Sequence, residues 1–408
     1  MDETDGSTSV QEILRFNQGR DVRRLALKYA AMRRDAFGFL RGSCHLFYGN
    51  LPADAVLAGA PLTWISGDLH LENFGCYKGD NRLAYFDIND FDEACLAPCS
   101  WDLLRFLTSV LIGAATLAVS ERQALGLCRS YLAAYAGCLR DGKPRWIERA
   151  VAQGMLRDLL RDVKRFDRRK LLKKRTRLRH GRRVFRVPSE RALETTAAER
   201  KQVKQFMQAF AREQEQPRFF RVLDVADRIA GNGSLGVRRY VVLVEGHGTD
   251  DGNFLLDIKE AIPSSAAAQR PPAQPAWKDE AERVVTLQRQ IQAIPPALLS
   301  AVTIGKRPFV LKELQPVEHR ANLAAWDGKF KRLELAVINM AQLTAWGHLR
   351  AAGWRGAAAR EELCGYGADG RWAKGLLELA RQHSRAITGQ WREFCTAYDD
   401  GVVERALE

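Results

Sequence analysis

Apolar positions along the chain alternate between helical and strand-like spacing. In the first sixty residues they recur at loosely helical spacing among many charges, and the same spacing returns from Ser100 to about Leu139. Between residues 219 and 262, runs of strand-forming residues are broken by glycine turns, which predicts a small antiparallel sheet. A loop containing three prolines, a helix from Trp277 and the short strand "RPFVLKEL" follow.

The rest of the chain is again helical, beginning with "KFKRLELAVINMAQLTAWGHLRAAG". The pattern therefore predicts an α+β fold in three segments: a helical part over residues 1–218, a sheet-rich part over 219–316, and a helical return over 317–408. A chain of 408 residues is long enough for two lobes rather than one compact unit.

One stretch combines apolar and polar positions more densely than the rest. "ISGDLHLENFG", residues 65–75, places an aspartate, a histidine, a glutamate and an asparagine between apolar residues, and such groups are unfavourable to bury unless they bond each other or a ligand. "KGDNRLAYFDINDFDEA" follows, in which a "GDN" turn precedes a strand-like run and then an acidic cluster. We expect a loop, a turn and a strand of hairpin type here.

The composition of the chain predicts its cellular compartment and the state of its cysteines. The acidic, polar start "MDETDGSTSV" lacks the features of a signal peptide, and the longest apolar run, residues 106–119, is too short to span a bilayer comfortably. The eight cysteines form no C-x-x-C pair, which gives little support to a zinc site or a disulfide framework. We expect a cytoplasmic protein with no membrane span and reduced cysteines that serve packing.

Positive charge is concentrated in one segment. Residues 157–186 hold fifteen Lys or Arg against three Asp, a balance of +12 within a chain whose net charge is +14. Such a block attracts nucleic acid, anionic lipid or a phosphorylated substrate, although a solvated helix and loop without a dedicated partner fits equally well. No base-reading motif accompanies the charge, so we expect at most weak, salt-sensitive contact with nucleic acid.

The acidic loop pair has the composition that phosphoryl transfer requires. Asp68 and Asn73 are five residues apart, and "DINDFD" follows fourteen to nineteen residues after Asn73. Phosphoryl transfer needs a carboxylate to orient the acceptor hydroxyl, and an amide oxygen with a second carboxylate to hold Mg²⁺ against nucleotide phosphates. An Asp, an Asn and a later Asp supply that set in the usual chain order.

"GDLHLENFG" with "FDINDFDEA" resembles the catalytic and metal-binding loops of aminoglycoside-phosphotransferase-like enzymes in the protein-kinase-like superfamily. Together with "FLRG" and "WDLLR", these motifs more closely resemble the bacterial family called domain of unknown function 2252. The resemblance implies that Asp68 is the catalytic carboxylate, Asn73 a metal ligand and Asp90 the metal ligand on the phosphate side. Asp87 is an alternative to Asp90, and Asp102 resembles the aspartate that braces the catalytic loop.

Three neighbouring residues have open roles. His70 is grouped with Asp68 as a catalytic candidate, although both residues could simply cap a turn. Arg41 of "FLRG" suits either a phosphate or an ion pair with one of the aspartates. Glu72 is expected to face solvent.

A second set of residues suits a nucleotide. "IAGNGSLGVRRYVVLV" contains a G-x-G-x-x-G pattern, Gly231, Gly233 and Gly236 with Ser234 between them, and a strand follows it as in the phosphate-covering hairpin of kinases. Lys259 in "LLDIKEA" resembles the kinase lysine that contacts the α- and β-phosphates, although an ordinary edge lysine is an alternative.

The helix from Trp277 offers Glu282 or Glu280 as a partner for Lys259. "FVLKELQP", residues 309–316, resembles the last strand and hinge of a small lobe, whose backbone would meet the adenine.

The order of these motifs departs from that of kinases. Here the catalytic and metal loops come first, and the glycine loop follows about 140 residues later. Cutting the kinase pattern between its long helix and its catalytic loop, and joining the old ends through residues 190–220, reproduces this order. The resemblance therefore implies a circularly permuted, two-lobed kinase-like fold, in which 219–316 is the small nucleotide-binding lobe and the flanking segments form the large lobe.

The activity we expect is an ATP- and Mg²⁺-dependent phosphotransferase that acts on a small molecule or a protein side chain. Nucleotidyl transfer with ATP reversed in the same cleft is an alternative. A catalytically silent protein that binds nucleotide, or nucleic acid through residues 157–186, is another.

Overall fold

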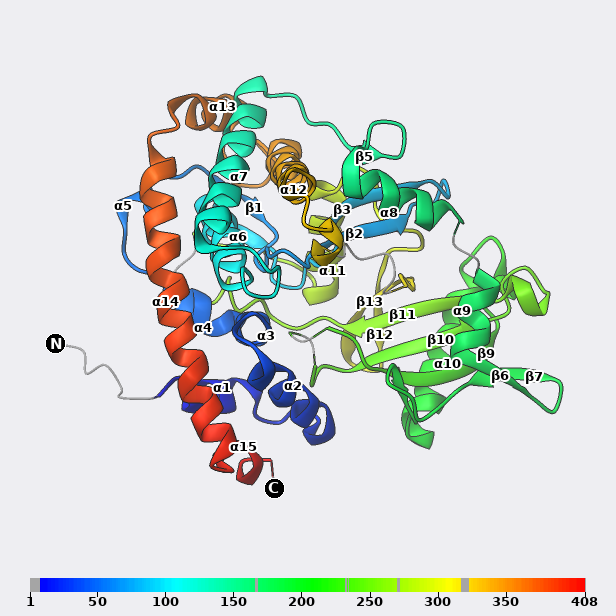
Figure 1. The fold of residues 1–408 in the computed structure, drawn as a ribbon. Coiled ribbons are helices and arrows are strands. Elements are labelled where there is room, and N and C mark those ends of the chain that lie inside the picture. The colour runs from blue at the N-terminus through cyan, green and yellow to red at the C-terminus, as the bar shows by residue number, and fades with distance from the viewer. Residues whose placement is uncertain are drawn as a thin grey trace.

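The computed structural model describes residues 8–165, 168–231, 233, 235–269, 272–316 and 323–407, and the glycine-loop residue Ser234 lies outside them. The described chain forms one part built mainly from helices and one part built around a six-stranded sheet (Figure 1). One large buried apolar cluster fills the helical part, and two smaller clusters lie on the faces of the sheet. The mixed helix-and-sheet class expected from the sequence is confirmed.

The helices fall into three groups along the chain. The N-terminal group is α1 (Ser9–Asn17), α2 (Val22–Arg34), α3 (Ala36–Gly42), α4 (Cys44–Gly49) and α5 (Ala55–Ala58). The middle group is α6 (Ser100–Ile112), α7 (Glu121–Asp141), α8 (Gly154–Arg165), α9 (Arg168–Arg175) and α10 (Ala197–Arg212). The last group is α11 (Glu280–Ile291), α12 (Phe330–Arg350), α13 (Arg360–Asp369), α14 (Trp372–Asp399) and α15 (Val402–Arg405). Short 3-10 turns occur at Pro217–Phe220, Asp250–Gly252 and Leu323–Trp326.

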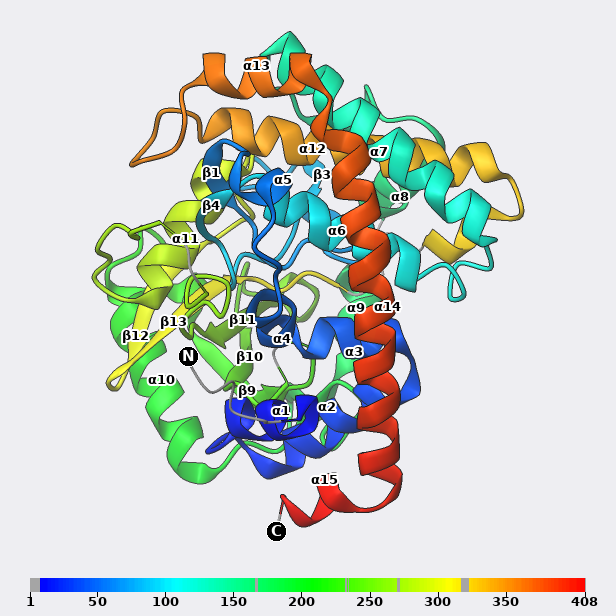
Figure 2. The same ribbon diagram turned by 90° about the vertical axis from the view of Figure 1, so that its left-hand side faces the viewer.

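The N-terminal helices begin where side chains can cap them. Thr8 and Gln11 cap α1 reciprocally, and the carboxylate of Asp21 accepts a hydrogen bond from the backbone N–H of Arg24 at the start of α2. The long helix α14 runs past α6 as well as α1 to α3, which ties the N-terminal helices to the helical core (Figure 2). The helical spacing of the first sixty residues is confirmed.

Two short antiparallel pairs hold the acidic loops. β1 (Leu62–Ile65) pairs with β4 (Cys95–Pro98), and β2 (Phe74–Lys78) forms a hairpin with β3 (Ala84–Ile88), to which the two-residue β5 (Ile147–Glu148) adds. Residues 66–73 connect β1 to β2, and residues 89–94 connect β3 to β4. The hairpin expected around the "GDN" turn is confirmed.

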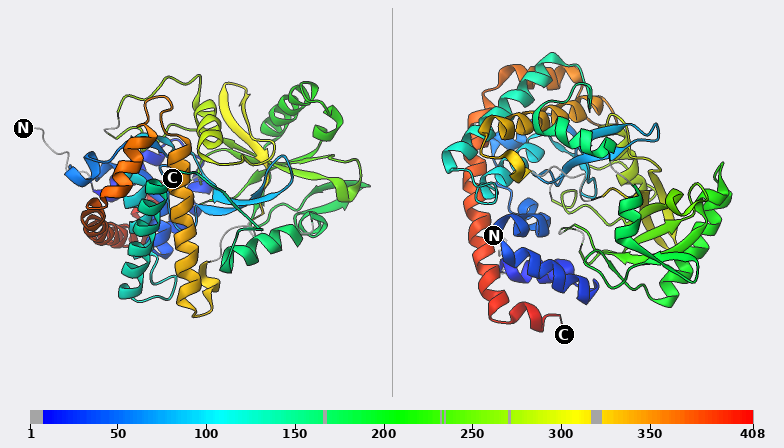
Figure 3. Two further views of the ribbon diagram at one scale, coloured as in Figure 1. Left: turned by 90° about the horizontal axis from the view of Figure 1, so that it is seen from above. Right: turned by 45° about the vertical axis from the view of Figure 1, so that its right-hand side comes forward.

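The largest sheet is antiparallel throughout and curls into a half-barrel. Its strands are ordered β12, β13, β11, β10, β9, β8. They span β8 (Ala192–Leu193), β9 (Val222–Arg228), β10 (Arg239–Val244), β11 (Phe254–Glu260), β12 (Ser300–Ile304) and β13 (Arg307–Glu313). Both views in Figure 3 place this sheet on one side of the molecule and helices α7, α12 and α14 on the other.

Period-two alternation gives the sheet two different faces. One face, with Val242 and Leu256 at its centre, is apolar and packs on α10. On the other face, Leu243 and Leu255 are covered by α9 and a small hairpin, whereas the row that contains Lys259 is directed toward the acidic loops. The sheet therefore presents its charged residues to one side of the cavity described in the next subsection.

The sheet part begins earlier in the chain than expected. β8 extends the sheet, α10 covers one face, and α9 covers the other, although all three precede the expected boundary at residue 218. Within the basic segment, the chain after α9 is a β-hairpin, β6 (Thr176–Arg179) and β7 (Arg182–Phe185), rather than helix and loop. Its turn places His180 and Gly181 at positive φ, the geometry that closes a two-residue hairpin.

Two expectations from composition concern membranes and cysteines. Within the described ranges, no helix combines the length and the apolar character that a membrane crossing requires. All eight cysteines are free thiols and five of them are buried, in agreement with a packing role.

Candidate active site

The loop between β1 and β2 is held by a buried carboxylate from α6. Asp102 accepts hydrogen bonds from the backbone N–H groups of Ser66 at 2.8 Å and Gly67 at 3.0 Å, and its side chain is fully buried. From the other side, the ring Nε2 of His348 on α12 lies 3.4 Å from the same carboxylate. Asp102 therefore fixes the start of the loop, which is the bracing position implied by the sequence resemblance.

A glycine lets the two acidic loops approach each other. Gly67 has φ +78°, and a Cβ atom at this position would overlap the backbone carbonyl of Glu93 in the second loop. The side-chain amide of Asn73 donates to the carbonyl oxygens of Asp68 at 2.9 Å and Asp90 at 3.3 Å, which links the loops further. Donation by the amide nitrogen leaves the Asn73 Oδ1 atom as the group available to a ligand.

Asp68 stands between these loops, with its side chain 20% exposed. Arg105 on α6, which is fully buried, donates through Nε to Asp68 Oδ1 at 2.7 Å. Burial raises the pKa of Asp68, and the charge of Arg105 opposes that rise. Sequence reasoning missed Arg105, although it is the last residue of "WDLLR" and lies one helical turn beyond Asp102 on the same side of α6.

His70 lies close to Asp68 and also stabilises the loop between β1 and β2. Its Nε2 atom lies 3.8 Å from Asp68 Oδ2, while its Nδ1 atom accepts the backbone N–H of Glu72 at 3.1 Å. Glu72 is 42% exposed and pairs with Arg41 Nη1 at 2.5 Å. Arg41 therefore forms an ion pair, and its partner is a glutamate rather than an aspartate.

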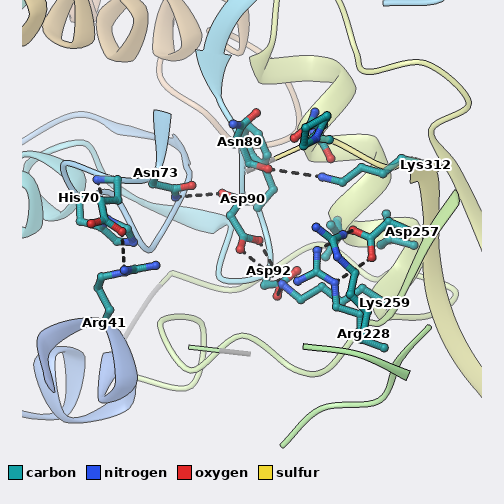
Figure 4. A pocket seen from close by; sticks show the side chains of 18 of the residues that line it. Arg41, His70, Asn73, Asn89, Asp90, Asp92, Arg228, Asp257, Lys259 and Lys312 are labelled. Atoms are coloured by element: carbon teal, nitrogen blue, oxygen red, sulfur yellow. Dashed lines mark hydrogen bonds and ion pairs between the residues drawn. The ribbon is translucent and has the colours of Figure 1, made fainter. Parts of the chain in front are cut away.

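A cavity separates the acidic loops from the sheet (Figure 4). Lys259 extends into it from β11, and its Nζ atom lies 3.4 Å from both carboxylate oxygens of Asp90 and in contact with the carboxylate of Asp92. Lys259 and Asp90 are 169 residues apart in the chain. The sheet and the acidic loops thus contribute opposite charges to one site.

The neighbouring cations make Asp90 a strong acid. Burial by itself raises the pKa of Asp90, but Lys259, Lys312 and Arg239 outweigh it and lower the pKa to about 2. A carboxylate that stays ionised and an amide oxygen from Asn73 are oxygen donors of the kind that Mg²⁺ prefers. Among the described residues, no group of three or more His, Cys, Asp or Glu side chains is placed to hold a metal ion.

Asp87 lies away from the cavity. Its Oδ1 atom accepts the backbone N–H of Ile88 at 2.9 Å, and its Oδ2 atom lies 3.7 Å from Arg350 on α12. Asp87 is buried and fixes β3 to the helical core. Of the two alternatives, Asp90 is therefore the carboxylate that faces the cavity.

The expected pairing of Lys259 with a glutamate of α11 is wrong. Glu280 pairs with Arg283 at 2.6 Å, and the Glu282 carboxylate accepts the backbone N–H of Lys278 at 2.6 Å. The face of α11 that lines the cavity carries Val284 and Gln288 instead. Asp92 and Asp90 supply the carboxylates of the ion pair because β11 places Lys259 opposite the second acidic loop.

The glycine loop connects β9 to β10 and approaches the loop of Asp68. Gly231 and Gly236 have φ values of +76° and +98°, which favour glycine. A Cβ atom on Gly233 would lie 3.0 Å from the Arg41 carbonyl oxygen and 3.9 Å from Asp68 Oδ2. Gly233 therefore lies between the N-terminal helices and the site.

The sheet wall carries further charges that the motif search did not single out. Arg239 and Arg228 both pair with the buried carboxylate of Asp257. The Nζ atom of Lys312 lies 3.5 Å from the carbonyl oxygen of Asn89 (Figure 4). The period-two spacing of Asp257 and Lys259 on β11 is the signal that could have indicated a charged sheet face.

The basic segment lies partly on the helical part and partly on the sheet. Its helix α8 packs on α12 and on the β2–β3 hairpin. In the rest of the segment, Leu171, Leu172 and Phe185 are buried against the face of the sheet that also carries Lys259. Most of its described Lys and Arg side chains are exposed, among them Arg177, Arg179 and Arg182 on the β6–β7 hairpin. The segment therefore combines a structural apolar side with a solvated basic side.

These features define a mixed helix-and-sheet protein in which a curled antiparallel sheet closes over a pair of acidic loops. A family model described as an uncharacterised protein conserved in bacteria (DUF2252) matches residues 20–397, and the chain belongs to this family. No curated protein and no solved structure matches the chain. The family resemblance carried by the motifs is confirmed.

Gly67→Ala should destabilise the protein more than Gly19→Ala. Both glycines have φ +78°, but an added Cβ meets no heavy atom within 4 Å at Gly19 and overlaps the Glu93 carbonyl at Gly67. We expect a loss of about 1–2 kcal/mol in unfolding free energy for Gly19→Ala from backbone strain, and about 1–3 kcal/mol more for Gly67→Ala. Urea denaturation measures both values, and equal losses would contradict the close contact between the loops.

Weak, salt-dependent binding of single-stranded nucleic acid is the most that we expect from the basic segment. Replacing Arg177, Arg179 and Arg182 by Gln should lower the slope of log affinity against log salt by about 2, since each neutralised phosphate contributes about 0.7 on a single strand. The matched control replaces the exposed Lys201, Lys204 and Arg212 of α10 by Gln and should leave the slope unchanged. A tight complex that survives high salt would contradict this expectation.

Proposed function

We propose that this protein is an ATP- and Mg²⁺-dependent phosphotransferase with a circularly permuted, two-lobed kinase-like fold. The observation that carries the proposal is the 3.4 Å approach of Lys259 to Asp90 across one cavity. The sequence predicts Lys259 from a glycine loop and a strand, and Asp90 from an acidic loop pair. These two predictions are separate, so the approach of the two side chains in one cavity supports the proposal.

Two further contacts support the permuted arrangement. Gly233 of the glycine loop lies beside Asp68, as a phosphate-covering loop requires. The helix α12 comes more than 250 residues after the catalytic loop, yet its His348 contacts Asp102, which braces that loop. The lining of the cavity also includes Gln315 and Pro316 of the expected hinge and the apolar side chains of Val284 and Val310. These residues would suit an adenine ring better than the charged ones.

Nucleotide binding replaces protein carboxylates by phosphate oxygens around Lys259. In the structure, Asp92 and Asp90 satisfy the ammonium group. The cavity measures about 90 Å³, which is smaller than ATP. The proposal therefore expects the sheet and the acidic loops to separate when ATP binds, or the nucleotide to extend beyond the cavity.

The acceptor reacts on the side of Asp68. Its hydroxyl oxygen attacks the γ-phosphorus, the bond to the β-phosphate oxygen breaks, and Asp68 takes the hydroxyl proton while ADP leaves. Arg105 holds the Asp68 carboxylate in position. Mg²⁺ bound through Asn73 Oδ1 and Asp90 would neutralise the phosphate charge.

Nucleotidyl transfer has one observation in its favour. The sheet wall of the cavity carries Lys312, Arg228 and Arg239 beyond Lys259, which would suit a triphosphate that lies reversed along the sheet. Two of these cations already share Asp257, however, so Lys312 is the one of the three with no carboxylate oxygen within 4 Å among the described residues. The products separate the two reactions, because phosphoryl transfer releases ADP and nucleotidyl transfer releases pyrophosphate.

ATP with Mg²⁺ should raise the melting temperature far more than ATP with a chelator. The carboxylate of Asp90 repels bare phosphates and binds them through the cation, and a ligand at one hundred times its Kd stabilises by about 2.7 kcal/mol. Asp90→Asn should abolish most of the Mg²⁺ dependence, whereas the control Asp162→Asn, at a site 72% exposed on α8, should retain it. Equal shifts with and without Mg²⁺ in the unaltered protein would reject the metal assignment.

Asp68→Asn should remove turnover and keep nucleotide binding. A positioned base contributes roughly 10²- to 10⁴-fold in rate, while the phosphates are held by Lys259 and the cation. The variant should also melt at a lower temperature, since Arg105 loses its carboxylate partner inside the protein. Its ATP consumption is therefore compared below its own melting point, and undiminished consumption would exclude Asp68 as the catalytic carboxylate.

A further inference from the structure

A second cavity lies on the other side of Asp68, between the catalytic loop and the N-terminal helices. It shares Arg41, His70, Asp90 and Asp92 with the first cavity, and Arg20 and Lys28 line it as well. Its volume is about 60 Å³, which is room for roughly four to six waters at about 10–15 Å³ each. A single small polar group fits this space, and a folded polypeptide segment does not.

Lys28 in the wall of this cavity is a buried lysine without an ion-pair partner among the described residues. It belongs to α2 and is 1% exposed. Its Nζ atom donates to two neutral oxygens, Asn17 Oδ1 at 3.1 Å and the Gly233 carbonyl at 3.4 Å. Within the described chain, no carboxylate oxygen lies within 4 Å of this ammonium group. Burial lowers the pKa of Lys28 to about 7, as expected for a buried ammonium group without a counter-ion.

The neighbouring polar side chains also have unused hydrogen-bonding capacity. The guanidinium group of Arg20 stacks over the ring of Phe16 at 4.7 Å. Arg41 uses one amino group for Glu72, and its buried Nε atom has no partner among the described residues. The ring of His45 is also stacked on Phe16, and both of its buried ring nitrogens likewise have no hydrogen-bond partner in the described chain.

The carboxylates in the same wall already have partners. Asp68 is paired with Arg105, and Asp90 and Asp92 are both paired with Lys259. The Glu93 carboxylate accepts the backbone N–H groups of Ser265 at 2.5 Å and Ala266 at 3.2 Å. A ligand in this cavity would therefore accept hydrogen bonds from Arg20, Lys28 and Arg41. Because these three hydrogen-bond donors are positively charged, they favour an anionic ligand.

We propose that this cavity binds a phosphate group of the acceptor, so that the substrate class is a small phosphorylated alcohol. The inference rests on the proposed phosphotransferase activity. Arg20, Lys28 and Arg41 hold the phosphate already present, which directs a nearby hydroxyl of the same molecule toward Asp68. A phosphate dianion offsets several cations at once and matches the fork of an arginine.

The same contacts explain why the N-terminal helices cover the site. Lys28 donates to Gly233 of the glycine loop, and a Cβ atom on Gly233 would lie 3.0 Å from the carbonyl of Arg41. An anion held between α2 and α3 would therefore lie directly beside the loop that covers the nucleotide phosphates. Acceptor and nucleotide would be held by adjoining walls with Asp68 between them.

Inorganic phosphate is the probe that tests this site without any nucleotide. We expect sodium phosphate near pH 7 to raise the melting temperature in a saturable manner, by about 1–3 °C at ten times its Kd, relative to sodium chloride at equal ionic strength. Lys28→Met should abolish this rise and be at least as stable as the unaltered protein, because it removes a buried charge without a counter-ion. The control is Arg23→Met, which removes one charge from the exposed side of α2 and should retain the full rise.

The outcomes separate the acceptor site from the nucleotide site. A phosphate effect that is absent in the unaltered protein, or equal in Lys28→Met and Arg23→Met, would overturn the inference. Sodium acetate as effective as phosphate would overturn the assignment to a phosphate group. A non-hydrolysable ATP analogue with Mg²⁺ is then added to the same three proteins, and equal stabilisation of all three supports separate sites. Loss of that stabilisation in all three would reject the nucleotide proposal while leaving the phosphate result in place.

Discussion

The ion pair between Lys259 and the acidic loop is the interaction on which the arrangement of the two parts depends. Lys259 lies on a sheet whose other face packs on α10, and it carries its charge into a buried position. Asp90 and Asp92 balance that charge from a loop of the helical part. Because a buried charge without a counter-ion is strongly unfavourable, the sheet and the loops hold each other in register at this point. The same contact determines which side chains share the cavity.

The helical part also makes the site rigid. Asp102 and Arg105 lie one turn apart on α6, one holding the backbone of the catalytic loop and the other the carboxylate of Asp68. The packing of α6 against α7 and α14 supports both residues from behind. Under the proposed function, the site therefore joins a precisely held carboxylate to a sheet that moves when a nucleotide binds. Enzymes commonly combine rigidly held catalytic residues with a part of the chain that closes over the substrate.

Local patterns predicted the elements well, and long-range pairing was harder to predict. The "GDN" turn, the alternation along β10 and β11 and the helical spacing after Ser100 are signals within a few residues of each other, and the structure has these elements. The partner of Lys259 depends instead on which element lies opposite β11, and the kinase order suggested α11 although the acidic loop lies there. Asp87 and Asp90 have the same chemistry, and only the orientation of β3 distinguishes them. The role of Lys28 at the site is also visible only in three dimensions, because α2 reads as an ordinary charged helix.

The central claim is that one nucleotide bridges the sheet and the acidic loops. A crystal structure of the protein with Mg²⁺ and a non-hydrolysable ATP analogue tests it most directly. The account predicts density for the phosphates between Lys259 and Asp90, with the cation bound to Asp90 and Asn73 Oδ1, and with Asp92 released from Lys259. A nucleotide bound outside this cavity, or phosphates without contact to Lys259, would contradict it.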